Sequence, residues 1–389
     1  MQPRRSARLL GAEDYLFSFV DRARALAEAA GADVIPLGVG DCDLPTPPHI
    51  VAALRRAAID PAQHRYPPYE GTSELRHAAA RYLRRRFDVG ADPDTEVTVT
   101  LGSKEAMAHL SLAYLEPGDV ALVPDPAYPV YATWARFCGA EVVRMPLRED
   151  NGFLPDLSAI PAHVARRAKL LWVSYPNNPT TALATRAFYD ELASFCTGYG
   201  IVAASDAAYS EIYFDTEPPP SLLEAPGAME CGIEFHSLSK AYNMAGWRVG
   251  FAAGTPSIVE ALRTVKTHTD SGTFGAVQHA AATALDDTTS GYTDRLRATY
   301  RNRTRLLCDG LEAAGLQVLR PRATFYCLVR TPEGMDAEGL AKRLLEEARV
   351  LSIPGTGFGP GGEGFVRLTV CADTPVLAEA VRGVGALRW

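Results

Sequence analysis

"EVTVTLGSKEAMAHLSLAYL", residues 96–115, joins a short run rich in β-branched residues to a longer stretch with helical spacing. The same alternation recurs downstream. DVALVP (119–124) precedes PVYATWARFCG (129–139), and KLLWVS (169–174) precedes TRAFYDELASFCTGYG (185–200). Repeated strand-then-helix units predict a mostly parallel sheet that is covered by helices on both faces. We therefore expect an α/β fold.

The alternation of strand and helix candidates continues to about residue 314, after which short strand candidates predominate. IVAAS (201–205), IEFHSL (233–238) and RVGFAAG (248–254) are further strand candidates, and helical stretches follow to about residue 314. Beyond them, the short runs LQVL, FYCLVR, RVLSI and FVRLTV surround the helix-like DAEGLAKRLLEEA. This last part is typical of a separate α+β lobe.

Length and composition indicate two domains. A chain of 389 residues, 47% of them hydrophobic, can bury a sizeable core and divides more readily into two units than one. The first 45 residues are too few to fold alone. We predict a large domain over 46–285 and a smaller one formed by 1–45 together with 286–389.

Several classes of partner are disfavoured by composition. The net charge is −7 with both signs interspersed, which leaves no basic stripe for nucleic acid or an anionic membrane. No apolar run approaches a membrane span, and the N-terminus lacks the features of a signal peptide, so we expect a cytoplasmic location. Seven scattered cysteines without a C-x-x-C pair predict reduced thiols, and the eight histidines show no metal-ligand spacing, so we predict no metal.

Lys240 is the first candidate for chemistry. Most lysines are solvated surface charges, but this one lies between Ser237 and Ser239 on one side and Arg248 on the other. An amine held among cationic and desolvated groups can lose its proton and form a Schiff base with an aldehyde. A phosphate on that aldehyde would explain the arginine.

An aldehyde cofactor such as pyridoxal phosphate needs an acidic partner for its ring nitrogen. VAASDAAYSEIYFD, residues 202–215, places Asp206 at the end of an apolar strand, where open α/β sheets bind ligands, and Tyr209 three residues later. Asp206 could instead cap a helix or a turn, and Tyr209 could be a packed aromatic residue whose hydroxyl faces solvent.

Three further features lie at the ends of predicted strands. Gly102, Ser103 and Lys104 open a helix, whose N–H groups can bind phosphate, although Ser103 could be only a cap. Tyr128 lies in a Pro-rich turn, where its ring could stack on a planar cofactor. Asn178, in YPNNPTT, could donate to a phenolic oxygen, although Asn-Pro is also a common turn.

Arg367 lies inside GFVRLTV, an apolar strand in which an unpaired cation would be costly, and a substrate carboxylate is a natural partner. The Gly-rich stretch 354–364 lacks the lysine-serine ending of a P-loop, so we interpret it as a loop that positions Arg367. His236, next to the lysine motif, is interpreted as a packing residue.

The order of these features resembles the fold type I pyridoxal-phosphate enzymes, and among them the class I/II aminotransferases. The resemblance covers nearly the whole chain. HRYPPYEGTSELR (64–76), MPLREDNGFLPDLSAIP (145–161), DAAYSEIYFD (206–215) and IEFHSLSKAYNMAGWRVGFA (233–252) are similar to the LL-diaminopimelate aminotransferases and their bacterial relatives. The resemblance implies a large domain with a mostly parallel seven-stranded sheet flanked by helices, and a smaller α+β domain.

The resemblance also implies roles for single residues. It makes Lys240 the Schiff-base lysine, Asp206 the partner of the pyridine nitrogen and Tyr209 a donor to the phenolic oxygen, and these three are the predicted catalytic residues. The predicted cofactor-binding residues are Gly102, Ser103, Lys104, Tyr128, Asn178, Asp206, Tyr209, Ser237, Lys240, Arg248 and Tyr66.

Substrate binding and assembly follow from the same resemblance. Arg367 would hold the α-carboxylate of the substrate, together with Asn178 and Gly40. Tyr66 would reach the cofactor phosphate of a neighbouring subunit, which implies a homodimer with shared active sites.

The sequence departs from the family pattern at three positions. Thr181 stands where a glycine usually follows NPT, Cys42 replaces the proline of a GDPD motif, and Ser205 stands where many relatives carry histidine. None of these changes removes a cofactor-holding residue. We expect Thr181 and Cys42 near the entrance of the substrate-binding site, where they would affect substrate specificity.

The resulting hypothesis is an aminotransferase that moves an amino group between an L-amino acid, LL-diaminopimelate or a related one, and a 2-oxo acid such as 2-oxoglutarate. A β- or γ-elimination or replacement enzyme of specialised metabolism would use the same scaffold and lysine. The effector domain of a transcription regulator is a third reading, which lacks support because no DNA-binding domain is recognised in the chain.

Overall fold

The computed structural model describes residues 4, 6–10, 25, 31 and 33–389. Its central sheet has seven strands in the order β2-β8-β7-β6-β5-β3-β4. These strands are β2 (Val97–Thr100), β3 (Val120–Asp125), β4 (Glu141–Pro146), β5 (Ala168–Ser174), β6 (Val202–Asp206), β7 (Gly232–Ser237) and β8 (Gly250–Gly254). β8 alone runs opposite to the other six strands, so the sheet is mostly parallel as predicted.

The strand β4, at one edge of the sheet, is not among the strands expected from the sequence. This strand pairs with β3 alone, and only Met145 of its six residues is buried. Glu141 and Arg144 lie within it. An edge strand needs few buried positions, so its sequence carries neither an apolar run nor a regular alternation.

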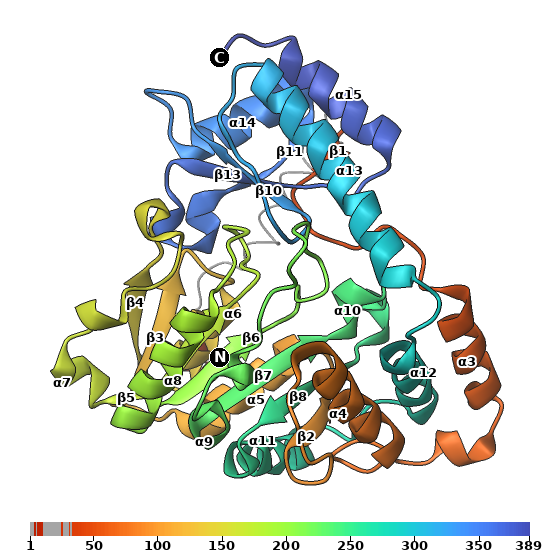
Figure 1. Cartoon of the computed structure of the whole chain (residues 1–389). Coiled ribbons are helices and arrows are strands. Elements are labelled where there is room, and N and C mark those ends of the chain that lie inside the picture. Colours follow the sequence, from red (N-terminus) through yellow and green to blue (C-terminus); the bar gives the residue numbers. More distant parts are fainter. Residues whose placement is uncertain (1–3, 5, 11–24, 26–30, 32) are drawn as a thin grey trace.

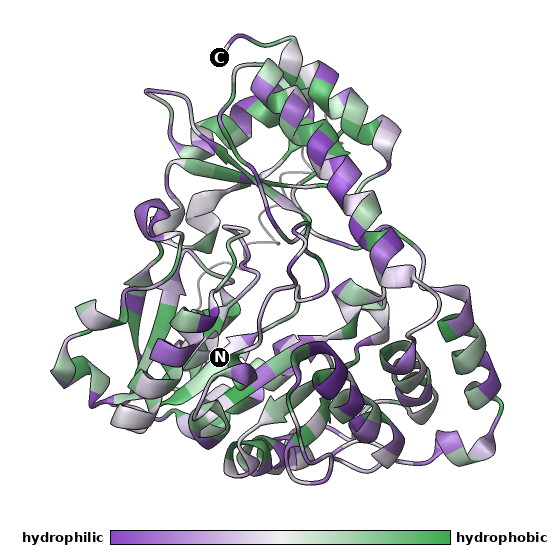
Figure 2. Ribbon diagram, viewed as in Figure 1, coloured by the Kyte–Doolittle hydropathy of each residue, from purple (hydrophilic) through white to green (hydrophobic). Residues whose placement is uncertain are grey.

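Side chains of successive strand residues point to opposite faces, and helices cover both faces. On β5, Leu170 and Trp172 pack against one helical layer, whereas Leu171 and Val173 pack against the other. The first layer contains α5 (Ser103–Tyr114), α6 (Val130–Phe137) and α11 (Pro256–Thr269). The second layer contains α8 (Arg186–Tyr199) and α9 (Ala228–Cys231). Figure 2 shows apolar residues concentrated on the strands between these layers.

A third group of helices packs at the β2 end of the sheet. It contains α3 (Pro48–Ala58), α4 (Ser73–Phe87) and α12 (Gly275–Asp286). Thr72 caps α4 by accepting a hydrogen bond from the amide of Leu75, and the helix ends at Asp88 in the left-handed region.

The C-terminal lobe has its own sheet and core (Figure 1). Its strands are ordered β12-β13-β10-β9: β9 (Val318–Leu319), β10 (Tyr326–Arg330), β12 (Ile353–Pro354) and β13 (Phe365–Thr369). The helices α13 (Tyr292–Ala313), α14 (Ala337–Ala348) and α15 (Thr374–Gly385) complete the lobe. All of its predicted strands are present, but RVLSI is divided between β11 (Val350–Leu351) and β12.

The N-terminal region meets this lobe where the structure describes it. β1 (Ile35–Pro36) pairs in parallel with β11. Most of residues 1–32 lie outside the described residues, so the prediction that all of 1–45 joins the lobe is tested only for its last part. The remaining elements are α1 (Ala7–Leu10), α7 (Ala162–Ala165), α10 (Leu238–Ala241), η1 (Pro61–His64), η2 (Glu149–Asn151), η3 (Leu157–Ala159), η4 (Leu222–Glu224), η5 (Ala245–Trp247), η6 (Gly355–Phe358) and η7 (Pro360–Gly362).

Within the described part of the chain, no helix has the length and apolarity needed to cross a bilayer. All seven cysteines are free thiols, and four of them are buried. The Sγ atoms of Cys308 and Cys327 lie 3.5 Å apart.

Thr181 carries local backbone strain. Its φ of +64° lies in the left-handed region, which a β-branched residue rarely adopts. The residue is buried, and its amide donates to the carbonyl of Asn177, which holds the turn in place. The family's usual glycine would adopt this conformation without strain.

We predict that Thr181→Gly raises the free energy of unfolding by about 1 kcal/mol, because relief of left-handed strain outweighs the extra chain entropy of glycine. Thermal and urea unfolding of the apo-protein will measure the change. Thr181→Ala, which keeps a Cβ, is the control and should gain much less. A loss of stability in the glycine variant would contradict the strain argument.

Candidate active site

A cavity of about 270 Å³ lies at the carboxyl ends of the parallel strands, between the two lobes. It is lined by Val39, Gly40, Ser103, Lys104, Tyr128, Asn178, Asp206, Ala208, Tyr209, Ser237, Ser239, Lys240, Ala245, Arg248 and Tyr326. Most of the predicted site residues therefore converge, although they are spread over more than 200 positions of the sequence. Parallel strands end at one edge of the sheet, and this brings their terminal residues together.

A larger hollow of about 820 Å³ lies at the surface beside η2, η3 and α8. Its charged lining residues include Arg148, Asp150, Asp156 and Glu191. No candidate catalytic residue from the sequence lines it, so we place the active site in the smaller cavity.

Lys240 lies in the short helix α10, which follows β7 directly. Its Nζ donates a hydrogen bond of 3.0 Å to the carbonyl oxygen of Gly40, in the N-terminal region. Burial lowers the pKa of Lys240, but the nearby acidic groups, with Cys42 and Tyr326 foremost, hold it above its usual value. The amine is therefore cationic here.

Asp206 ends β6 and is 6% exposed. Its Oδ2 accepts a hydrogen bond of 2.7 Å from the Tyr131 hydroxyl, and its Oδ1 accepts one of 3.2 Å from the amide of Ala208. Burial raises the pKa of Asp206 to about 6, although the Tyr131 hydrogen bond lowers it. No salt bridge to Asp206 forms within the described residues, so this carboxylate is available to a cationic ligand.

The start of α5 forms one wall of the cavity. Gly102 is its N-cap with φ of +80°, and a methyl group there would lie 2.5 Å from Nη2 of Arg248. The positive φ therefore favours glycine, and the missing Cβ allows the guanidinium to approach the backbone closely. Arg248 donates to the carbonyl of Ala245 at 2.8 Å, and Ser103 follows at the first turn of the helix. Backbone amides, a hydroxyl and a guanidinium at a helix start suit a phosphate group.

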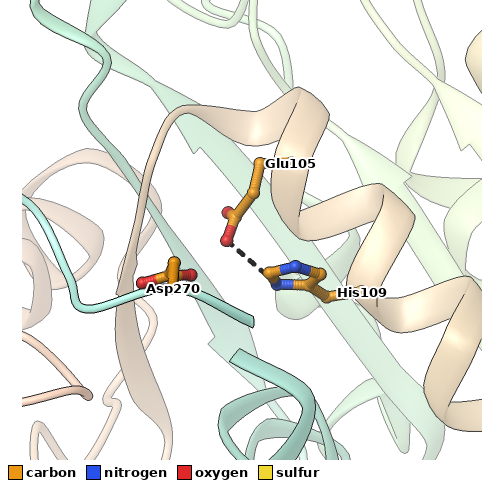
Figure 3. Close-up of side chains that lie close together, drawn as sticks. All are labelled: Glu105, His109 and Asp270. Atoms are coloured by element: carbon orange, nitrogen blue, oxygen red, sulfur yellow. Dashed lines mark ion pairs between the residues drawn. The ribbon is translucent and has the colours of Figure 1, made fainter. Parts of the chain in front are cut away.

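A cluster of polar and charged side chains, Glu105, His109 and Asp270, lies beside the first turn of α5 (Figure 3). Glu105 lies 2.9 Å from His109 one helical turn later and accepts a hydrogen bond from the amide of Leu101. With Asp270, these side chains have the donor types of a metal site. However, the ammonium of buried Lys266 lies 2.8 Å from Asp270 and 3.9 Å from Glu105, so a cation is already supplied. We assign the cluster a structural role.

Arg367, on β13, is fully buried and does not itself line the cavity. Its Nη1 donates to Oδ1 of Asn178 at 2.6 Å and its Nη2 to the carbonyl of Gly38 at 2.8 Å, whereas its buried Nε has no partner among the described residues. The ring of Phe358 lies 4.6 Å from the guanidinium. Phe358 belongs to the Gly-rich stretch, which therefore contacts Arg367 as predicted.

Tyr326 is a cavity residue that the sequence analysis missed. It begins β10, which pairs with β13 beside Arg367, and its hydroxyl lies 2.9 Å from that of Tyr209. A tyrosine in an apolar strand has the pattern of a core residue, so no local signal distinguishes it. Only the pairing of β10 with β13 places it in the site.

Other predicted residues lie elsewhere. Tyr66 is 88% exposed and does not line the cavity. Thr181 and Cys42 are also absent from its wall, although the Cys42 thiol donates to the carbonyl of Ser239 beside Lys240. Ser205 bonds to the buried carboxylate of Glu234 instead of facing the cavity. His236 stacks on Phe251 at 4.7 Å, in keeping with the predicted packing role.

The sequence profile of the family described as Aminotransferase class I and II matches residues 32–384. The chain belongs to this family. It is 47% identical to the LL-diaminopimelate aminotransferase of Aquifex aeolicus, covering 98% of this chain and 99% of that one, and 48% identical to that of Syntrophobacter fumaroxidans, covering 96% of each.

Solved structures agree with the sequence relatives. The structure of BacF from Bacillus subtilis without ligand superposes with a TM-score of 0.96 at 37% identity, covering 100% of this chain and 99% of that one. A probable N-succinyldiaminopimelate aminotransferase from Thermus thermophilus has a TM-score of 0.89 at 37% identity, covering 95% and 99%. The fold type and the class of enzyme predicted from the sequence are thus confirmed: this is a pyridoxal-phosphate-dependent aminotransferase.

The residues around the cavity fit this cofactor. Gly102 lets the guanidinium of Arg248 approach the start of α5, and this guanidinium and the Ser103 hydroxyl are donors that suit the phosphate. Asp206 lies in the same cavity without an ion-pair partner among the described residues, as the ring nitrogen requires, and Lys240 supplies the amine.

We predict that Asp206→Asn stabilises the apo-protein at pH 8 by up to about 3 kcal/mol, because it removes an ionised carboxylate whose pKa is raised in the folded state to about 6. The folded protein binds this proton more tightly than the unfolded chain. The penalty is therefore present above pH 6 and disappears as the pH falls towards 4, and so should the advantage of the variant. Thermal unfolding from pH 4 to 8 measures this trend. Asp286→Asn, at an exposed carboxylate, is the control, and a pH-independent difference would contradict the prediction.

Proposed function

We propose that this aminotransferase takes its amino group from LL-diaminopimelate, or from a related L-amino acid, and delivers it to a 2-oxo acid such as 2-oxoglutarate. The donor is suggested by the names of relatives that are 45–49% identical over nearly the whole chain. The observation that carries the reaction is the presence of Lys240 and Asp206 in one cavity, with Arg367 directly behind its wall.

Each predicted residue has a role in this proposal. When bound, pyridoxal phosphate supplies a carbonyl for the amine and a ring that withdraws electrons from the substrate. Asp206 would keep the ring nitrogen protonated. Lys240 Nζ would remove the proton from the substrate Cα and then return a proton to the carbonyl carbon of the cofactor. The cationic amine would first have to lose its own proton. Arg367 would orient the α-carboxylate of both substrates.

The other cofactor contacts are proposed as follows. Ser103, Lys104, Ser237 and Arg248 would hold the phosphate at the start of α5, and Tyr128 would stack on the ring. Asn178 and Tyr209 would donate to the phenolic oxygen. For Asn178 this role leaves its Oδ1 free to accept from Arg367, as it does here at 2.6 Å.

We also propose the domain division 46–285 against 1–45 with 286–389. The seven-stranded sheet and the C-terminal sheet fall within these two sets. Tyr209 and Ile212, however, pack into the core of the C-terminal lobe although their numbers assign them to the large domain. The segment that follows Asp206 therefore joins the two domains at the active site.

A homodimer with shared sites is the proposed assembly. Of the eight large exposed apolar side chains among the described residues, three lie within residues 59–69 and one precedes α12: Ile59 at 82%, Tyr66 at 88%, Tyr69 at 47% and Phe274 at 43% exposure. The ring of His64 lies 6.2 Å from that of Phe274, which places α12 beside this segment. A grouped apolar surface of this kind favours a partner, and the family resemblance makes that partner a second copy.

The purified holoenzyme, incubated with LL-diaminopimelate and 2-oxoglutarate, should form glutamate. Free ammonia or a replaced side chain would support elimination or replacement chemistry instead. Lys240→Ala is the control and should abolish both the product and the visible absorption of the bound cofactor. No turnover with a panel of L-amino acids would contradict the proposal.

Arg367→Ala should raise KM by about 10- to 100-fold for the amino and the oxo substrate together, because one charged donor serves both carboxylates. Steady-state kinetics with each substrate varied in turn will measure this. Arg81→Ala, which removes an exposed arginine on α4, is the matched control. An effect on one substrate only would indicate another carboxylate anchor.

Mixing Lys240→Ala with Tyr66→Ala should restore activity to about a quarter of the native level, because half of the randomly formed dimers then carry one intact site. Each variant alone should be nearly inactive. Activity measured after mixed unfolding and refolding tests this, with each variant refolded separately as the control. No gain on mixing would contradict a shared site.

A further inference from the structure

Tyr326 contacts several predicted site residues at once. Its hydroxyl lies 2.9 Å from the Tyr209 hydroxyl, and the centre of its ring lies 4.0 Å from the guanidinium carbon of Arg367. A side chain at Gly40 would clash with its hydroxyl, and Gly40 accepts the hydrogen bond from Lys240. Tyr326 is 3% exposed, so these contacts occur in a largely dry environment.

We propose that Tyr326 is a positioning residue that couples the carboxylate-binding Arg367 to Tyr209, by packing its ring on the first and donating its hydroxyl proton to the second. The inference rests on the proposed function of this site. It goes beyond that function by assigning a role to a residue of the C-terminal lobe that acts only through its neighbours.

The direction of the bond between the two tyrosines decides what Tyr209 can do. A phenol has one proton to donate. If Tyr209 donates to Tyr326, it has none for a ligand in the cavity. If Tyr326 donates, the Tyr209 proton is free to point at the phenolic oxygen of the cofactor, and the bond it receives makes Tyr209 a stronger donor.

The surroundings favour a protonated Tyr209. Burial raises the pKa of Tyr209 well above its ordinary value, although the positive charge of Arg367 lowers it. Tyr209 therefore stays a donor at any working pH. The same arginine lies against the face of the Tyr326 ring. A shift of Arg367 towards a substrate carboxylate would therefore move this ring and change the hydrogen bond between Tyr326 and Tyr209.

The ring of Tyr326 also limits the motion of Arg367. The guanidinium lies between the rings of Tyr326 and Phe358, at 4.0 and 4.6 Å. Its Nη atoms are held by Asn178 and Gly38. Cation–π contacts on a desolvated guanidinium are stronger than exposed ones, and they keep its plane fixed before substrate arrives.

The test is a double-mutant cycle with Tyr326→Phe, Tyr209→Phe and the combined variant, read without substrate. The pH midpoint of the visible colour change of the bound cofactor reports how well its phenolic oxygen is stabilised. Tyr326→Phe keeps the ring and removes the hydroxyl, so the midpoint should rise by about half to one pH unit. In the Tyr209→Phe background the same change should have no effect.

Each other outcome overturns the proposal. A lower midpoint in Tyr326→Phe would mean that Tyr209 donates to Tyr326 in the native protein. An equal shift in both backgrounds would mean that Tyr326 acts without Tyr209. Tyr189→Phe, which removes another buried hydroxyl in the core beneath α8, is the matched control and should leave the midpoint unchanged.

The ring contact is tested separately with Tyr326→Leu. Loss of the ring should raise KM for the amino and oxo substrates by about 3- to 10-fold relative to Tyr326→Phe. Equal KM values in the two variants would show that the ring of Tyr326 does not help Arg367 to bind the substrate. These readouts distinguish failures: a native protein without visible absorption would refute the proposed function, whereas an unsuitable amino donor would leave the pH titrations unaffected.

Discussion

The active site depends on a carboxylate that the fold buries without an ion-pair partner among the described residues. Asp206 ends the central strand β6, accepts two hydrogen bonds, and still has its pKa raised to about 6 by burial. Such a group is costly in a folded protein unless a cation meets it. In the proposed function the protonated ring nitrogen of the cofactor would be this cation, and its binding would recover the free energy lost by burying the carboxylate.

The segment that leaves Asp206 connects this site to the second lobe. Tyr209 and Ile212 pack in the C-terminal core, and Glu211 between them is bonded by Arg86 of α4 and Arg297 of α13. Lys240 reaches across to the carbonyl of Gly40. These contacts span the two lobes, so a change in the position of one lobe would move the proposed cofactor-binding and substrate-binding residues together.

Much of the architecture was predictable because parallel strands that are covered on both faces carry long apolar runs. KLLWVS and IVAAS became β5 and β6 within one residue of their predicted limits. The edge strand β4 was missed because only Met145 is buried in it. The neighbours that raise the pKa of Lys240 could not be predicted from its local sequence, because Cys42 and Tyr326 are nearly 200 and more than 80 residues away.

By itself the sequence determined the kind of chemistry. A lysine, a strand-terminal aspartate, a glycine-serine helix start and a buried arginine are residue types whose order along the chain is set by the order of the strands. Tertiary structure alone decided how these groups are tuned. The pairing of β10 with β13 brings Tyr326 between Tyr209 and Arg367. Burial raises the pKa of Asp206, and acidic groups from other parts of the chain raise that of Lys240. Both effects depend on distances between residues that are remote in the chain, and a local pattern does not encode such distances.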